Sequence, residues 1–223
     1  MRFEKKTFKD FRSKGKAEFD DIEFVKCHFV NCYLGERGAS KRPVIRNVRL
    51  LNCSQDRCLL VAPILQDILV DGLNTKGQMP EIRGAALSQV TLRGKIDRLW
   101  IRPSVIEPSM QGEIDKANAK FYKDVEWALD IRQIDCKELD IKGIPVELIR
   151  RDPETQGVVT HEKAMEDRWK ELKFRCGLSR VVLEEATETD SGALLIACKR
   201  DPNVKELLAD LKMLRKEGIA EPD

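Results

Sequence analysis

The sequence predicts a solenoid with sides five residues long, followed by a helical C-terminal region. Its clearest sign is a run of four consecutive five-residue blocks between Ala17 and Glu36. A large apolar residue stands at every fifth position of this run, and a smaller one stands two positions earlier: Phe19, Phe24, Phe29 and Leu34, preceded by Ala17, Ile22, Cys27 and Cys32. A period of five fits neither an amphipathic helix nor a half-buried strand. It fits a coil whose sides each turn two side chains inward.

The pattern pauses at Gly35–Arg42, a polar, basic, glycine-rich segment that is typical of a protruding loop. It then returns at strict spacing from Pro43 to Thr75, and again from Pro80 to Leu92. Because four such sides make a coil of about 20 residues, we expect a solenoid over residues 17–103. Residues 1–16, with Phe3, Phe8 and Phe11, form either an irregular first coil or a cap.

Over about 85 residues these blocks resemble the pentapeptide-repeat family, whose consensus is Ala-(Asp/Asn)-Leu-x-x. All eight inward positions of the first run are apolar, whereas Gln55 and Thr75 occupy inward positions later in the chain. The resemblance implies a right-handed quadrilateral β-helix. Some members of that family present an acidic, duplex-like surface to DNA topoisomerase, and the basic N-terminal half of this chain argues against that mechanism here.

The repeat predicts which side chains form the core. The inward ladder comprises Ala17, Phe19, Ile22, Phe24, Cys27, Phe29, Cys32, Leu34, Val48, Leu50, Cys53, Cys58, Leu60, Leu65, Ile68, Val70, Ala85, Leu87, Val90 and Leu92. If the Gly35–Arg42 loop adds no side, Cys27 stacks on Cys53 and Cys32 on Cys58. We interpret these cysteines as small core residues and expect no metal or cofactor site, because zinc ligand pairs sit in tighter knuckles.

An α-rich region is expected over residues 104–223, after a linker by composition at Pro103–Gly112. An apolar stripe from Ile114 to Ile131 predicts a helix to about residue 132. Residues 134–143 fit the five-residue template again, which indicates a brief return of the solenoid. Three more helices are expected, at about residues 160–174, within 178–199 with a break near Asp190–Gly192, and from Asp201–Pro202 to Gly218.

Composition limits the class of protein. Residues 1–103 carry 20 Lys and Arg against 12 Asp and Glu, a net charge of +8, and the remainder of the chain carries −6. No apolar signal-like segment and no stretch of about 20 apolar residues is visible. We therefore expect a cytoplasmic protein that does not enter a membrane. The seven cysteines are expected to be reduced thiols.

No catalytic motif stands out. The two histidines, His28 and His161, lack the spacing of a zinc protease, and the glycine-rich phosphate-binding motifs are missing. We therefore expect a non-enzymatic scaffold that binds another protein, and a toxin-immunity role or a homodimer is compatible with it. An enzyme that uses Arg150, Asp152 and His161 ranks third, behind the binding of nucleic acid or another polyanion.

Two basic runs are the candidate contact points for a partner or a polyanion. The residues singled out are Lys41, Arg42, Arg46, Arg49, Arg93 and Arg98. Phosphate contacts favour such clusters of cations. However, no aromatic residue is interleaved with them for base stacking, which weakens the nucleic-acid alternative.

Overall fold

A bend at every fifth residue is the local cause of the fold. The computed structural model describes residues 1–13, 16–35, 41–188 and 192–221. The backbone takes a left-handed φ of 49–55° at Asp21, Lys26, Asn31, Asn47, Asn52, Arg57, Ala62, Asp67 and Gln89, and glycine does so at Gly72, Gly84 and Gly94. Most of these residues are Asx or glycine, which tolerate this conformation best. The five-residue period in the sequence therefore marks bends between extended segments.

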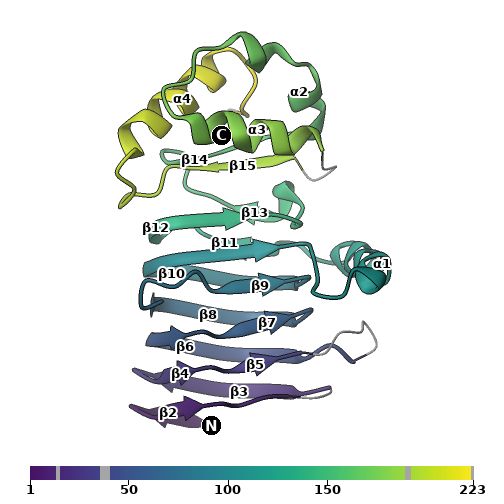
Figure 1. Ribbon diagram of the computed structural model, residues 1–223, viewed down its shortest axis with the longest axis vertical. Coiled ribbons are helices and arrows are strands. Elements are labelled where there is room, and N and C mark those ends of the chain that lie inside the picture. The colour runs from purple at the N-terminus through teal and green to yellow at the C-terminus, as the bar shows by residue number, and fades with distance from the viewer. Residues whose placement is uncertain (14–15, 36–40, 189–191, 222–223) are drawn as a thin grey trace.

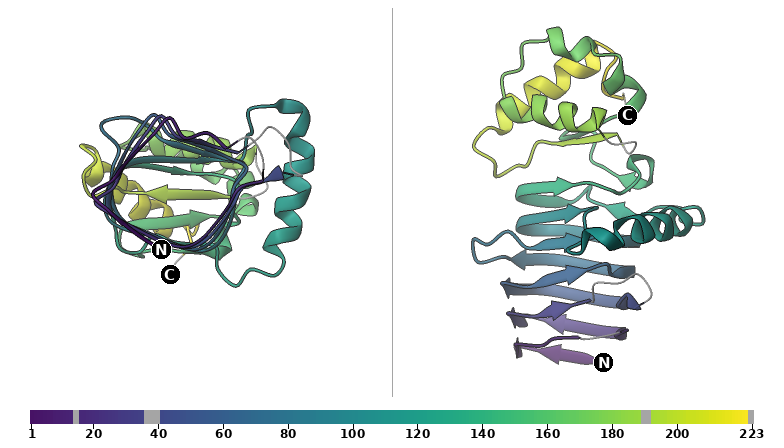
Figure 2. Two further views of the ribbon diagram at one scale, coloured as in Figure 1. Left: turned by 90° about the horizontal axis from the view of Figure 1, so that it is seen from below. Right: turned by 45° about the vertical axis from the view of Figure 1, so that its right-hand side comes forward.

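These bends let successive turns of the chain pair side by side. Glu18 lies opposite Val44, Val44 opposite Ile64, and Ile64 opposite Ala86. Every pairing that the structure records in this sheet is parallel, and the layers rise from the N-terminal strands towards the C-terminal region (Figure 1). Seen from below, the layers share one curled outline (Figure 2).

The sheet has 13 strands. They are β1 (Arg2–Glu4), β2 (Thr7–Lys9), β3 (Glu18–Val25), β4 (His28–Val30), β5 (Tyr33–Leu34), β6 (Val44–Asp56), β7 (Leu59–Val61), β8 (Ile64–Asn74), β9 (Glu81–Arg83), β10 (Ala86–Arg102), β11 (Leu129–Asp130), β12 (Ile134–Ile141) and β13 (Ile149–Arg150). The main path of pairing runs β1-β3-β6-β8-β10-β9-β7-β5, with β2 paired to β4 at the N-terminal end.

This topology corrects the predicted fold class, a right-handed quadrilateral β-helix followed by an α-rich region. The molecule is built on one mostly parallel, curled sheet, with four α-helices among the described residues. The strands β6, β8 and β10 contain 13, 11 and 17 residues and so run on through the bends. The sheet also continues past residue 103 into β11, β12 and β13, because these segments pair with β10 or with each other.

The inward ladder predicted from the repeat lies on the sheet's interior side, and none of its residues is exposed. Val48, Leu87 and Val90 are almost fully buried and belong to the main core cluster. The predicted register is also found, since His28 lies opposite Ser54 and Tyr33 opposite Leu59. Cys27 therefore adjoins Cys53, and Cys32 adjoins Cys58.

The predicted helix up to residue 132 is wrong in its second half. Helix α1 spans Gln111–Tyr122 only. Ala128 and Ile131, which the apolar stripe placed in the same helix, are instead hydrogen-bonded into the sheet. The amide groups of these two residues donate to the carbonyls of Leu148 and Arg150. Between Ala128 and Ile131, hydrogen bonding to the sheet therefore decides the structure, although the apolar spacing is that of a helix. The predicted return at residues 134–143 corresponds to β12, which pairs with β10 along its length.

A small C-terminal unit covers the far end of the sheet (Figures 1 and 2). It consists of the antiparallel pair β14 (Gln156–Val159) and β15 (Ala193–Ile196) with α2 (His161–Met165), α3 (Gly177–Thr187) and α4 (Val204–Lys216). Its core includes Trp169, Leu183 and Leu214, each 1% exposed or less.

The helix predictions in this unit are partly corrected. The helix expected at about 160–174 is interrupted at Asp167, whose φ of 59° separates α2 from a short 3₁₀ turn at Arg168–Glu171. The helix within 178–199 is α3, followed by strand β15 instead of further helix, and residues 189–191 of the expected break lie outside the described part of the chain. The last helix is found as α4, but it begins at Val204 after Asn203 and not at the predicted Asp201–Pro202, and it is followed by Gly218 at a φ of 68°.

Cys136 and Cys198 form a disulfide that joins β12 to the segment after β15. This corrects the expectation that all seven cysteines are reduced. Arg200 strengthens the same junction, because its guanidinium donates to Asp97 at 2.8 Å and to the carbonyls of Ile96 and Asp135. Among the helices of the described residues, none combines the length and apolar character needed to cross a membrane.

Candidate interaction surface

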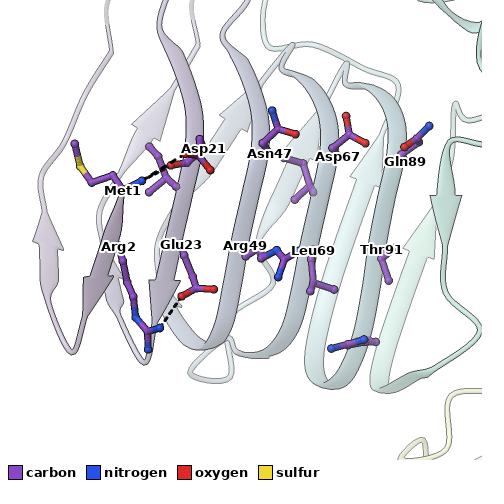
Figure 3. Close-up of a pocket in the computed structure, with 13 residues that line it drawn as sticks. Met1, Arg2, Asp21, Glu23, Asn47, Arg49, Asp67, Leu69, Gln89 and Thr91 are labelled. Atoms are coloured by element: carbon purple, nitrogen blue, oxygen red, sulfur yellow. Dashed lines mark hydrogen bonds and ion pairs between the residues drawn. The ribbon is translucent and has the colours of Figure 1, made fainter.

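An open groove crosses β1, β3, β6, β8 and β10 on one face of the sheet (Figure 3). Its volume is about 860 Å³. Two rows of side chains from successive strands form it: the bend row is Asp21, Asn47, Asp67 and Gln89, and the strand row is Arg2, Glu23, Arg49, Leu69 and Thr91. Met1 and Arg93 complete the lining, together with Ile22 and Ile68 of the inward ladder, which lie between the two rows.

The sheet register builds the strand row. Arg2 lies opposite Glu23, Glu23 opposite Arg49, and Arg49 opposite Leu69. Strands in a sheet lie about 4.8 Å apart, so each of these residues lies directly beside its neighbour in the next layer. The bend row follows from the left-handed residues, because the same bend recurs in each layer.

Most of the groove's charges are already paired. Arg2 lies 3.1 Å from Glu23, and Arg93 lies 2.8 Å from Asp71. The amino group of Met1 donates to the carbonyl of Asp21. Arg49 differs, since it is exposed and no ion pair or hydrogen bond joins its guanidinium to another described residue. Its cross-strand neighbours are Glu23, whose carboxylate is paired to Arg2, and the apolar Leu69.

An unpaired guanidinium beside an apolar side chain is suited to a partner that offers both a carboxylate and an apolar group. Arginine is enriched at protein interfaces for this reason, because its planar fork binds a carboxylate through two hydrogen bonds.

Only Arg49 and Arg93 of the six predicted contact residues lie together in this groove. Arg46 is exposed on the neighbouring face, where it donates to Gln66 at 2.9 Å. Arg98 lies 3.5 Å from Glu138. Lys41 is exposed at the edge of the described segment.

Arg42 is buried, which corrects its prediction as a contact residue. It is 7% exposed, and its guanidinium donates to the carbonyls of Ala62, Pro63 and Gly84 at 2.8–3.2 Å. Burial lowers the pKa of Arg42 to about 10, an effect that nearby Tyr122 partly opposes. Arg42 satisfies backbone acceptors at bends of two layers, so its role is in folding.

The surroundings of Arg42 explain why it is enclosed. Helix α1 packs over the same bends, where Asn118 donates to the carbonyl of Ala85 at 3.2 Å. Gly84 sits at a φ of 61°, and a Cβ there would lie 2.5 Å from Val105. Burial raises the pKa of Tyr122 to about 12, while its hydroxyl accepts a hydrogen bond from the amide of Leu87.

The inward cysteines lie in the core ladder. The thiols of Cys27 and Cys53 lie 3.5 and 3.3 Å from the carbonyls of Phe3 and Phe24. Burial raises the pKa of the Cys53 and Cys58 thiols. Within the described segments, no group of three or more His, Cys, Asp or Glu side chains is arranged to hold a metal ion.

The three residues of the enzyme alternative are engaged separately. Arg150 stacks 4.2 Å above the ring of Trp127, Asp152 accepts from the Thr155 hydroxyl, and His161 lies 3.0 Å from the carbonyl of Ala186. Of the interactions recorded for the described residues, none joins these three side chains to one another. The other histidine, His28, bonds to Ser54 at 2.8 Å.

Glu23, Asn47 and Leu69 in the groove were not singled out from the sequence. Their signal was nevertheless present: Glu23 and Leu69 follow inward residues at the same phase of the five-residue period, so they fall in one outward row. A search for runs of similar polarity does not find such a row, because its members alternate between charged and apolar types.

The sequence matches no family model, and comparison with curated proteins and with solved structures finds no match either.

Proposed function

We propose that this protein is a non-enzymatic scaffold that binds another protein through the groove centred on Arg49. The observation that carries the proposal is the unpaired Arg49 guanidinium beside Leu69 in an open groove whose other cations are paired. The partner's complementary surface presents a carboxylate next to an apolar side chain. A toxin-immunity role is one form of such binding, in which the partner is a toxin.

The structure offers less support for binding nucleic acid or another polyanion. Of the basic residues named above, Arg42 is buried, and Arg93 and Arg98 lie beside Asp71 and Glu138. Charges that are already paired release few counterions from a polyanion. A polyanion needs several free cations, whereas Arg49 is the one cation of the groove that no other described residue pairs.

We assign the protein to the cytoplasm, with support from its cysteines. Cys27, Cys32, Cys53, Cys58 and Cys176 are free, as is usual in a reducing compartment. The two cysteines of the disulfide are 1% and 3% exposed, so the folded protein shields the bond from reductants.

The test is an affinity capture from lysate of the source cells with the tagged protein, with and without nuclease. Two groove variants, Arg49→Glu and Leu69→Asp, are compared with the native chain. Arg46→Glu is the matched control, because it makes the same charge change on the neighbouring face. We expect one stoichiometric protein that survives nuclease, is lost with both groove variants and is retained by the control.

Two results would contradict the proposal. If the groove variants capture the protein as well as the native chain does, binding lies elsewhere. If nucleic acid is the main captured species and is released at moderate salt, the polyanion alternative replaces the scaffold.

A further inference from the structure

The N-terminal end of the sheet exposes unpaired strand edges over an aromatic core. Strand β1 pairs with β3 and strand β2 with β4, and none of the other described residues forms a strand on their second side. Phe3 stacks on Phe24, and Phe8 stacks on Phe29, with ring centroids 5.4–5.5 Å apart. Phe11 at the same end is 48% exposed.

The backbone of β1 is arranged to accept another strand. The carbonyl of Met1 accepts from the amide of Glu23 at 2.8 Å, and the amide of Lys5 donates to the carbonyl of Val25 at 2.9 Å. Because the hydrogen-bonding direction alternates along a strand, Arg2 and Glu4 turn their amides and carbonyls away from β3. These four groups form a free edge, which is the usual site of strand addition.

The side chains of β1 favour a second copy of the same strand. Arg2 and Glu4 are both exposed and lie on the same side of the sheet, 3.6 Å apart. If an identical strand runs antiparallel to β1 with Phe3 at the centre, Arg2 of each copy faces Glu4 of the other. Opposite charges directly across a strand pair stabilise it, and the free amides and carbonyls then bond in pairs.

We propose that β1 pairs antiparallel with β1 of a second copy, so that two sheets join at their N-terminal ends in a symmetric homodimer. A two-fold axis at Phe3 makes the contact self-complementary, as closed dimers require. Phe3, which is half-buried in the single chain, then lies opposite Phe3 of the other copy. Arg2 also lines the groove, but the β1 contact needs no bound partner, so sedimentation of the purified chain tests it independently of the proposed function.

Charge reversal tests this arrangement on the full chain by sedimentation. Glu4→Lys places Arg2 opposite a lysine, and Arg2→Glu places two glutamates opposite each other. We expect the native chain to have twice the mass of one chain at high concentration, and each variant to dissociate at least about tenfold more readily. An equal mixture of the two variants restores the dimer, because each copy then faces its complement.

Lys9→Glu is the control, since it makes a charge reversal on β2, outside the proposed contact. Circular dichroism checks folding, which matters for Arg2→Glu because Arg2 also pairs with Glu23. A native chain that stays monomeric at all concentrations overturns the proposal. So does a dimer that both variants leave intact, or a pair of folded variants whose mixture stays monomeric.

Discussion

The two ends of the sheet are made of the same kind of layer but differ in how they are covered. At the C-terminal end, Ile96, Leu129 and Ile131 are fully buried, and a disulfide and Arg200 fix the covering unit in place. At the N-terminal end, the equivalent inward residues Phe3 and Phe8 are only half-buried. The comparison shows that the repeat builds a core row in every layer, whereas its burial depends on what lies above or below that layer.

The largest expected effect comes from cutting the covalent link at the covered end. The Cys136–Cys198 bond closes a separation of 62 residues, so its loss in Cys136→Ser with Cys198→Ser should lower the free energy of unfolding by about 4 kcal/mol. Urea denaturation of the oxidised protein measures this. Cys176→Ser, at a buried free thiol of the same unit, should cost much less. Equal stability of the native chain and the double variant would show that the link does not hold the unit.

Truncating one inward residue at each end tests the comparison directly. Leu129→Ala should cost about 3 kcal/mol, because its side chain is fully enclosed and leaves a cavity. Phe8→Ala removes a larger side chain but should cost only about 1–2 kcal/mol in the monomer, since part of its surface already meets water. Thermal and urea unfolding measure both. Equal costs at low protein concentration would contradict the difference between the ends.

Arg42 gives a third site, on the flank between the two ends. Arg42→Met should lower stability by about 2 kcal/mol, because three buried carbonyls each lose a hydrogen bond, although those of Pro63 and Gly84 keep donors in the Ala86 amide and the Asn118 side chain. Arg42→Lys should recover part of this, since an ammonium donates but lacks the planar fork. Arg46→Met is the exposed control and should change stability by less than about 0.5 kcal/mol. A neutral Arg42→Met would mean that the bends do not need this cation.

The smallest expected effect is a pH dependence at the covered end. The hydrogen bond from Arg200 holds the pKa of Asp97 below its ordinary value, although partial burial opposes this. Since a lowered pKa stabilises the fold only while the carboxylate is ionised, the contribution is present above about pH 4 and is lost as the pH falls through the folded pKa. Its size is below about 1 kcal/mol because the pair is partly exposed.

Asp97→Asn checks this contribution. The free energy of unfolding of this variant should be lower than that of the native chain at pH 6. The two values should approach each other as the pH falls below about 4. Asp67→Asn, at an exposed bend in the groove, is the control. A constant difference across this range would show that Asp97 does not act through its charge.

Sequence reasoning succeeded where spacing alone decides the structure. The five-residue period placed Val48, Leu87 and Val90 inside and predicted that Cys27 adjoins Cys53. It did not predict that Ala128 and Ile131 leave the helical pattern for the sheet, because a free strand edge at β10 competes for them. The groove was not predicted because its strand row combines Glu23, Arg49 and Leu69. The only feature that these residues share is their position within the five-residue repeat.

The sequence by itself determined the bends at Asx and glycine, which tolerate a left-handed φ locally, whereas the bends at Lys26, Arg57, Ala62 and Gln89 carry no such local signal. It also determined the inward rows, because apolar residues recur at fixed spacing between bends. Only the tertiary structure decided which cations are available. Arg42 and Arg49 are similar in the sequence, yet one is enclosed by α1 and three carbonyls while the other faces an open groove. Their difference depends on residues 20 or more positions away, which no local pattern encodes.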